Sequence, residues 1–319
     1  MLKYLGTRLV MAFVVIVIVI TFLALLVHLI PGNPVTTIMG PRASPALAQI
    51  VRHDMNLDRP IPVQVWDFIT GAFRGNLGVD FVSNLSVTSL IANALPQTLA
   101  LAFTSLFIAV GLGVPVGVYA AKHVNGAADR LLAVVSVSFI TMPAFVVGLL
   151  LLLAFSVHIH VFPAIGTGSL SAPGDYLRHL VLPACALALT WIGYIGRLVR
   201  ANMLEVLGEP HIRTARAHGV RDGVVFYRLA LKNALIPVVA VLGVGLGSLI
   251  GGAIFVEVIF ARPGIGSLIY NAILERNYPV VRGGVLVVAI LFVFANLAAD
   301  IVYRFLDPRV RVELQNVKR

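Results

Sequence analysis

The sequence predicts an all-α membrane protein that crosses the bilayer six times, from its composition and its long uncharged runs. Of its 319 residues, 59% are hydrophobic and only 12% are charged, and the mean hydropathy is +0.96. Soluble globular chains carry about 25% charged residues, so this chain has too little charge to cover a soluble surface. The composition therefore excludes a cytosolic enzyme, a disordered chain and a secreted module.

Six apolar runs mark the predicted spans. A bilayer core about 30 Å thick needs about 20 residues of apolar helix. The first run is longer than a signal-peptide core and lacks a small-x-small cleavage site, so we expect a retained helix. The predicted spans cover residues 9–30, 95–121, 131–159, 180–196, 233–256 and 283–299.

Basic residues divide unevenly between the two sets of loops. Residues 1–8, 122–130, 197–232 and 300–319 hold 16 of the 24 Lys and Arg residues, whereas the acidic residues divide equally. Cytoplasmic loops carry an excess of Lys and Arg, so we expect both termini in the cytoplasm. This topology accounts for the net charge of +10, and we expect no nucleic-acid partner.

The long external segment 31–94 has mixed polarity. Ser44 and Pro45 have the pattern of a helix N-cap followed by proline at the first helical position. Its aromatic residues are candidates for anchors at the membrane interface, and the favoured interpretation of the whole segment is a structural lid without a ligand. These candidates are Trp66, Phe68 and Phe73.

The cytoplasmic loop 197–232 carries the most specific pattern in the chain. Gly208 and Pro210 break the fourth helix, and Pro210 can open a short helix that Gly219 ends in the left-handed conformation. Asp222 is a plausible N-cap for a second amphipathic helix that continues to Lys232. Small and cationic residues alternate in the short helix, which suits close docking into a protein cleft better than anchoring in lipid.

Motifs for chemistry are missing. No G-x-x-x-x-G-K-[ST], H-E-x-x-H or G-x-S-x-G element occurs, so we expect neither ATP binding by this chain nor hydrolase activity. The single cysteine, Cys185, excludes an intrachain disulfide and a cysteine-based metal site. His158 and His160 lie two residues apart, which places them on different faces of a helix. We therefore expect no metal and no cofactor.

The spans also lack ionisable residues at mid-depth, which ion-coupled carriers usually show. We therefore expect the chain to form a translocation pathway without its own energy source or coupling ion. Two alternatives stay open: a self-sufficient channel or carrier, and an intramembrane enzyme. The enzyme would need a nucleophile from the serines within spans and a base from the histidines, which lie near membrane edges. These residues are Ser105, Ser136, Ser138 and Ser156, with His28, His158 and His160.

Glycines at four-residue spacing mark a helix-packing face in the fifth span. Gly243, Gly247 and Gly251 share one side of the helix, and small residues let helices approach closely in lipid. Plain packing within the chain is favoured over a seam with a partner or a moving gate. Gly113 and Gly117 in the second span show the same spacing.

A series of short motifs resembles the permease subunits of dipeptide and oligopeptide ABC importers, a group that includes nickel and glutathione permeases. The order and spacing of the motifs carry the resemblance over nearly the whole chain. They are Tyr4–Arg8, Leu29–Pro34, Leu57–Pro60, Gly75–Gly78, Ile212–Gly219, Leu231–Pro237, Gly251–Ala253, Val256-Glu257, Pro263–Gly266, Tyr278–Val281 and Asp307–Arg311.

The resemblance implies a type I ABC importer permease fold and a single permease domain over residues 1–319. Within it, the first span lies at 9–30, the external loop at 31–94 and a five-span core at 95–305. Implied partners are a second permease subunit, cytoplasmic ABC ATPase subunits, an extracytoplasmic solute-binding protein and membrane lipid. The implied location is the cytoplasmic (inner) membrane.

The loop 205–219 would match the helix through which such permeases dock on the ATPase. The residues that would contact or position it are Glu205, Ile212, Arg213, Thr214, Ala215, Arg216, Ala217 and Gly219. The sequence departs from the general importer signature, because Arg213, Thr214 and Ala215 stand where Glu-Ala-Ala is usual. His218 replaces the usual lysine, and Asn33 the usual aspartate. We expect a peptide substrate, with nickel, glutathione or another small solute as the alternatives.

Overall fold

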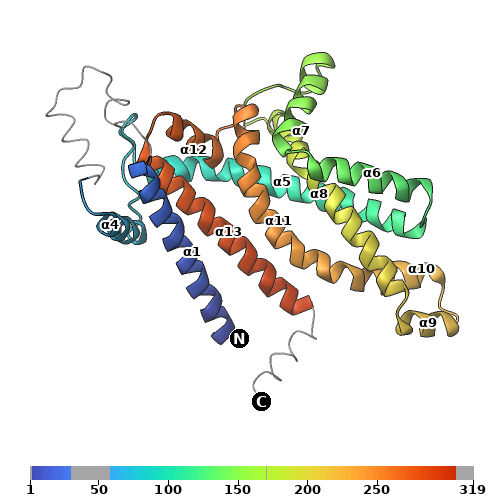
Figure 1. The fold of residues 1–319 in the computed structure, drawn as a ribbon. Coiled ribbons are helices and arrows are strands. Elements are labelled where there is room, and N and C mark those ends of the chain that lie inside the picture. The colour runs from blue at the N-terminus through green and yellow to red at the C-terminus, as the bar shows by residue number, and fades with distance from the viewer. Residues whose placement is uncertain (1, 30–57, 170, 307–319) are drawn as a thin grey trace. The chain divides into compact units, whose positions relative to one another are not determined.

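The computed structural model describes residues 2–29, 58–169 and 171–306, which are almost entirely helical (Figure 1). The predicted helix start at Ser44 and Pro45 lies outside these residues, as do Asn33 and the motif Asp307–Arg311. The chain divides into two compact units, one from residues 1–99 and 261–293 and the other from 100–260 and 294–319.

The first unit is built around short buried aliphatic side chains, among them Ile20, Val87, Ile265 and Val280. On α4, Trp66 and Phe73 are exposed, whereas Phe68 packs against this core. Its helices are α1 (Leu2–Leu29), α4 (Ile61–Phe73), α12 (Ile265–Leu274) and the first parts of α5 (Val87–Lys122) and α13 (Tyr278–Leu306).

The second unit holds the remaining parts of α5 and α13 with the helices from α6 to α11. Two of these, α8 and α11, pack closely together, and α8 also packs on α6 and α7. The helices are α6 (Ala127–Thr141), α7 (Ala144–Leu151), the π-helical turn η1 (Leu152–His158), α8 (Pro173–Leu207), α9 (Pro210–Ala217), α10 (Asp222–Val224), the π-helical turn η2 (Val225–Ala230) and α11 (Leu231–Ile259).

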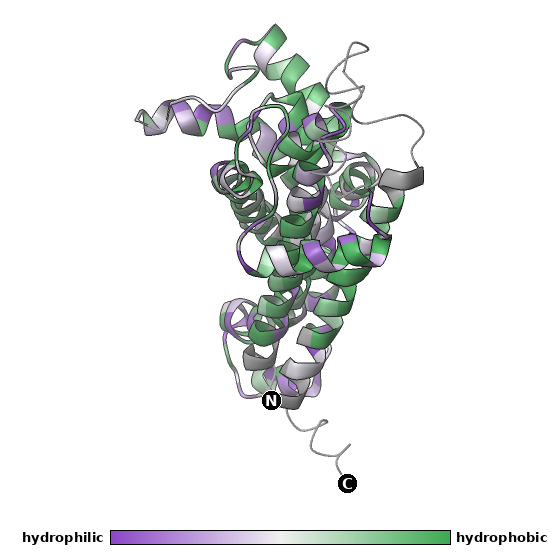
Figure 2. Cartoon of the chain, turned by 90° about the vertical axis from the view of Figure 1, so that its left-hand side faces the viewer, coloured by the Kyte–Doolittle hydropathy of each residue, from purple (hydrophilic) through white to green (hydrophobic). Residues whose placement is uncertain are grey.

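Among the described residues, five helices are long and apolar enough to cross a membrane, and a bent pair makes a sixth. Figure 2 shows these long helices coloured mainly as hydrophobic. The predicted span 131–159 is a bent pair of helices, with a bend of 105° between α6 and the run formed by α7 and η1. Pro143 lacks an N–H and holds Met142 in an extended conformation (φ −82°, ψ 127°), which ends α6. The fourth helix is longer than its predicted span.

Glycines set the close approach of α5 to α8. A Cβ atom on Gly117 would lie 2.4 Å from the carbonyl oxygen of Gly196. A Cβ atom on Gly113 would lie 3.0 Å from the Cβ of Ile195. The spacing of Gly113 and Gly117 therefore marks a crossing of two helices within the second unit.

Candidate functional site

The predicted cytoplasmic loop folds as a helix, a turn and a second helix. The fourth helix, α8, ends at Leu207, and the N–H groups of Gly208 and Glu209 bond to the carbonyls of Glu205 and Val206 at 3.0 Å each. Pro210 opens α9, where its missing N–H removes one donor that a first helical turn cannot satisfy. The predicted break and restart are confirmed.

Gly219 ends α9 in the left-handed region, with φ of +76°. Its N–H bonds to Arg216 O at 2.9 Å, and the N–H of Val220 bonds to Ala215 O at 3.2 Å. The predicted left-handed glycine is therefore confirmed. Asp222 is the first residue of the next helix and not its N-cap, which is Arg221.

The predicted helix from Asp222 through Lys232 is present, and it does not end there. The stretch from Asp222 through η2 continues into α11, and the whole run Asp222–Ile259 is one candidate span of 38 residues. No glycine or proline interrupts residues 224–236, so the sequence offers no reason to stop there. The turn at Gly219 is thereby joined directly to a membrane-crossing helix.

Ile212 fixes the position of α9 on the second unit. Its side chain is completely buried in a core cluster that also contains Met203, Val206 and Val225. Ala215, one turn further along the same face, packs against that cluster. The short helix therefore has one apolar face that faces its own chain.

The other face of α9 is open. The residues that the sequence singles out there are all exposed: Arg213, Thr214, Arg216, Ala217 and, beyond the helix, Gly219. Glu205 is exposed in the last turn of α8. The structure thus divides the eight predicted coupling residues into two that contact the core and six that are exposed.

The polar contacts of this segment are local. Arg216 pairs with Asp222 at 3.4 Å, and His211 Nδ1 lies 2.9 Å from Glu209 Oε2. The Thr214 hydroxyl donates to Pro210 O at 3.0 Å. Exposed ion pairs of this kind stabilise a fold by about 0–1 kcal/mol, so the cationic face stays available to a partner.

Asn202 links the two helices that carry the turn. Its Nδ2 donates to the carbonyl oxygen of Ala234 at 3.0 Å, which joins α8 to α11. Ala234 is buried, so this bond lies inside the helix pair and not in the loop. The helices on either side of the turn are therefore joined by a side-chain hydrogen bond.

The predicted glycine face of α11 is not uniform. A Cβ atom on Gly243 would lie 1.8 Å from the Cβ of Ala299 in α13, so this glycine permits a direct crossing. Gly247 is buried. Gly251 is exposed, and a Cβ atom there would have nothing within 4 Å. Gly245, outside the predicted series, makes room for Trp191.

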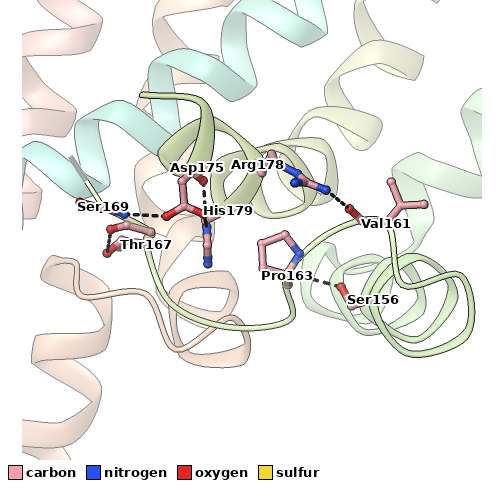
Figure 3. Close-up of polar contacts among 9 residues, drawn as sticks. Ser156, Val161, Pro163, Thr167, Ser169, Asp175, Arg178 and His179 are labelled. Atoms are coloured by element: carbon pink, nitrogen blue, oxygen red, sulfur yellow. Dashed lines mark hydrogen bonds and ion pairs between the residues drawn. The ribbon is translucent and has the colours of Figure 1, made fainter. Parts of the chain in front are cut away.

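At the opposite end of α8, polar side chains hold the loop that precedes it (Figure 3). Arg178 Nη2 donates to Val161 O at 3.0 Å, and Ser156 Oγ donates to Pro163 O at 3.3 Å. The N–H of Ser169 donates to Asp175 Oδ2 at 2.8 Å. One helix thus connects this loop to α9, over a length of about 50 Å at 1.5 Å per residue.

The side chains considered for an intramembrane enzyme bond to the backbone instead. Ser105, Ser136 and Ser138 donate to carbonyls three or four residues earlier, at 2.7, 3.2 and 3.1 Å. His158 Nδ1 lies 2.8 Å from Leu153 O. Within the described part of the chain, no group of three His, Cys, Asp or Glu side chains could hold a metal ion.

Two polar clusters were missed by the sequence reasoning. Asp129 pairs with Arg200, and Asp80 accepts hydrogen bonds from Ser83 and Asn277. Asp129 follows Gly126 as a first-turn acid, which is a readable helix-start signal. Asp80 and Asn277 are 197 positions apart, so no local pattern could have joined them.

Two family models that match the chain describe the same kind of transport component. A family model described as "Binding-protein-dependent transport system inner membrane component" matches residues 113–312, and a model of the N-terminal part of such components matches residues 1–102. The described site, residues 205–222, lies inside the first match.

Curated relatives resemble the chain over its whole length. A "Glutathione transport system permease protein GsiC" of Pectobacterium atrosepticum is 37% identical over 311 residues, covering 98% of this chain and 99% of the relative. A "Probable peptide ABC transporter permease protein y4tP" of Sinorhizobium fredii is 35% identical over 309 residues, covering 97% and 99%.

A solved structure shares the fold. The inward-facing MetNI methionine ABC transporter contains a chain that superposes with a TM-score of 0.57 at 22% identity. The match covers 68% of this chain and 96% of that chain. At this identity the likeness concerns the fold alone.

Proposed function

The chain belongs to the family of inner membrane components of binding-protein-dependent transport systems and is a multi-pass permease subunit of an ABC importer; from this premise we propose that it translocates peptides and is driven through α9. Its fold is that of type I importer permeases. The energy comes from ATP hydrolysed by a separate ATPase subunit.

The substrate class rests on the relatives. One is named for glutathione, itself a short peptide, and another for peptides. Glutathione is therefore the second candidate substrate, and nickel is a third from the wider group. The same membership supports a solute-binding protein outside the membrane, a second permease subunit beside this one, and a single permease domain over residues 1–319.

The contacts of α9 support a coupling role. Its inner face is fixed by the fully buried Ile212, while Arg213, Arg216 and Ala217 stay exposed. Small side chains permit close approach, and arginine donors suit carboxylates and carbonyls on a partner. We propose that an ATPase subunit binds this exposed face.

The helices around α9 support the transmission of movement. The preceding α8 reaches the external loop of Figure 3, and the hydrogen bond from Asn202 to Ala234 ties it to α11. A rigid shift of α9 therefore moves two spans together. When the ATPase subunits close on ATP, they would shift the permease between two states, as a partner that binds the states unequally must do.

The coupling proposal is tested at Gly219, whose φ of +76° disfavours a β-branched side chain. We expect Gly219→Val to abolish ATP-driven uptake by the complete importer in proteoliposomes while the permease still inserts. Gly219→Asn should keep most uptake, because asparagine tolerates this conformation. Gly223→Ala, at a position with nothing within 4 Å of the added atom, is the matched control.

Uptake by Gly219→Val at the wild-type rate would refute the coupling assignment. Uptake by the permease without any ATPase subunit would instead favour the self-sufficient carrier. The substrate is tested separately, by competition of unlabelled dipeptides, glutathione and Ni²⁺ against a labelled dipeptide. Failure of dipeptides to compete refutes the peptide proposal and leaves the coupling result standing.

A further inference from the structure

A cavity of about 730 Å³ lies between α6 and α8, two helices that run side by side in the second unit (Figure 1). It is separate from α9 and its turn. Its lining changes character along its length, with charged side chains at the predicted cytoplasmic ends of the two spans and apolar side chains further into the membrane. This gradient matches an amphiphilic occupant.

An ion pair between Asp129 and Arg200 lies at the charged end of the cavity. Arg200 Nη2 donates to Asp129 Oδ2 at 2.6 Å, and Arg200 Nε contacts the other carboxylate oxygen. The N–H of Asn125 also donates to Asp129 Oδ2, at 2.9 Å. The negative charge of Asp129, which is 7% exposed, is therefore neutralised within the chain.

Two further arginines at this end have no such partner. Arg130 and Arg197 both line the cavity and are exposed. The structure gives neither side chain a hydrogen bond or ion pair to any residue in 58–169 or 171–306. Because Asp129 and Arg200 neutralise each other, the positive charges of Arg130 and Arg197 remain uncompensated at this end of the cavity. This arrangement favours binding of an anion.

The depth of these arginines fits a lipid headgroup. Arg130 immediately precedes the predicted span 131–159, and Arg197 immediately follows the predicted span 180–196. From Arg130 the cavity continues along α6 to Ile140, ten residues and about 15 Å away. Val137, Ile140 and Tyr194 line this part and are 49%, 36% and 42% exposed.

We propose that this cavity binds one anionic phospholipid of the cytoplasmic leaflet. Its phosphate lies between Arg130 and Arg197, and an acyl chain lies along Val137 and Ile140. The guanidinium group is suited to phosphate, because its N–H groups match two oxygens at once. Basic pockets between spans on the cytoplasmic side are a recognised setting for anionic headgroups. Free phosphate would satisfy the arginines but leave the apolar part without an occupant.

The test uses the complete importer, purified in detergent, depleted of lipid and examined by native mass spectrometry. Dioleoyl phosphatidylglycerol, dioleoyl phosphatidylcholine and inorganic phosphate are titrated separately. The variant is Arg130→Gln with Arg197→Gln. The matched control is Arg228→Gln with Lys232→Gln, which removes the same charge from two exposed residues of the same predicted side.

We expect wild type and control to retain one phosphatidylglycerol. The arginine variant should lose about 25-fold in its affinity, at roughly fivefold for each of the two arginines. Phosphatidylcholine should bind more weakly and without regard to the variant. Equal retention of phosphatidylglycerol by all three proteins overturns the proposal. Displacement of the lipid by millimolar inorganic phosphate would identify a simple anion site and also overturn it.

A second measurement identifies the occupant of the apolar part. A photo-reactive benzoylphenylalanine at position 137 is activated in membranes that contain the complete importer. We expect a lipid adduct, and the arginine pair of substitutions should reduce its yield. A covalent adduct with the second permease subunit would make this face a subunit interface and refute a lipid site.

Discussion

The side-chain amide of Asn277 donates a hydrogen bond to the carboxylate of Asp80, across 197 positions of the chain. Ser83 and the N–H of Val82 donate to the same carboxylate, the latter at 2.9 Å. Two motifs that carry the family resemblance adjoin this contact: Gly75–Gly78 precedes Asp80, and Tyr278–Val281 follows Asn277. A Cβ atom on Gly78 would lie 3.3 Å from the Cβ of Pro279, so the motifs adjoin each other in the first unit.

Asp80→Asn should destabilise this junction by about 1–3 kcal/mol, since Asn277 then faces an amide in place of a carboxylate. Burial raises the pKa of Asp80, but the hydrogen bonds from Ser83, Val82 and Asn277 outweigh it and hold that pKa below its ordinary value. A depressed folded pKa stabilises the protein above the unfolded value of about 3.9, and this stabilisation is lost as the pH falls through the folded pKa.

Thermal unfolding of the purified importer measures both effects. The gap between wild type and Asp80→Asn should be full at pH 7 and shrink as the pH falls below about 4. Asp58→Asn, at an exposed residue, is the control and should leave the unfolding temperature unchanged. A gap that does not depend on pH would contradict the ionised state of Asp80.

Ile212→Ala should loosen α9 without removing any exposed side chain. The substitution leaves a cavity under the helix and costs about 2–5 kcal/mol for a fully buried isoleucine. We expect faster hydrogen exchange in residues 210–219 and reduced stimulation of ATP hydrolysis by substrate. Thr214→Ala, on the open face of the same helix, should leave the exchange rates nearly unchanged.

Gly243 and Gly251 should respond differently to the same small change. Gly243→Ala places a Cβ atom 1.8 Å from the Cβ of Ala299, so α11 and α13 must separate, at a cost of about 1–3 kcal/mol. Gly251→Ala meets nothing within 4 Å and should be neutral or slightly stabilising. Unfolding temperatures of the two variants compare these directly, and equal losses would show that packing at Gly243 does not limit stability.

Two buried arginines of the first unit provide a further contrast. Arg262 Nη2 donates to Gln97 Oε1 at 2.8 Å, so Arg262→Met leaves a partly buried amide oxygen without this donor. The Nε of Arg282 is buried without a hydrogen-bond partner, so Arg282→Met removes an unsatisfied group. We expect Arg262→Met to lower the unfolding temperature, and Arg282→Met to preserve or raise it. The opposite order would contradict the stabilising role of the hydrogen bond from Arg262 to Gln97.

The local features of the fold could be predicted from the sequence, because each depends on a few adjacent residues. Composition and run length located the membrane helices, and Gly208, Pro210 and Gly219 located α9 to the residue. The bend at Pro143 could not be predicted from the presence of a proline alone, since the prolines at 96, 115 and 183 lie within continuous helices. Only packing decides which proline interrupts a span.

The sequence could predict which segment forms the candidate site, but not which of its side chains face the core. Alternation of small and cationic residues indicated a docking helix, yet which residues turn inward depends on the core that receives Ile212. The pair Asp129–Arg200 and the cavity beside it depend on α6 lying against α8. Contacts between distant segments of this kind leave no periodic trace in a single sequence.

The bend between α6 and α7 involves Pro143, which lies between the two helices, and Thr190 in α8. Proline at 143 cannot donate to the carbonyl of Phe139, and the hydroxyl of Thr190 in α8 donates to that oxygen at 3.1 Å. The carbonyl oxygen of Phe139, which would otherwise lack a donor in the hydrocarbon, thus receives its hydrogen bond from a neighbouring helix. Straightening this bend would accordingly require substitutions of both Pro143 and Thr190. Replacing Pro143 alone restores the backbone N–H, but the Thr190 hydroxyl still bonds to the carbonyl oxygen of Phe139.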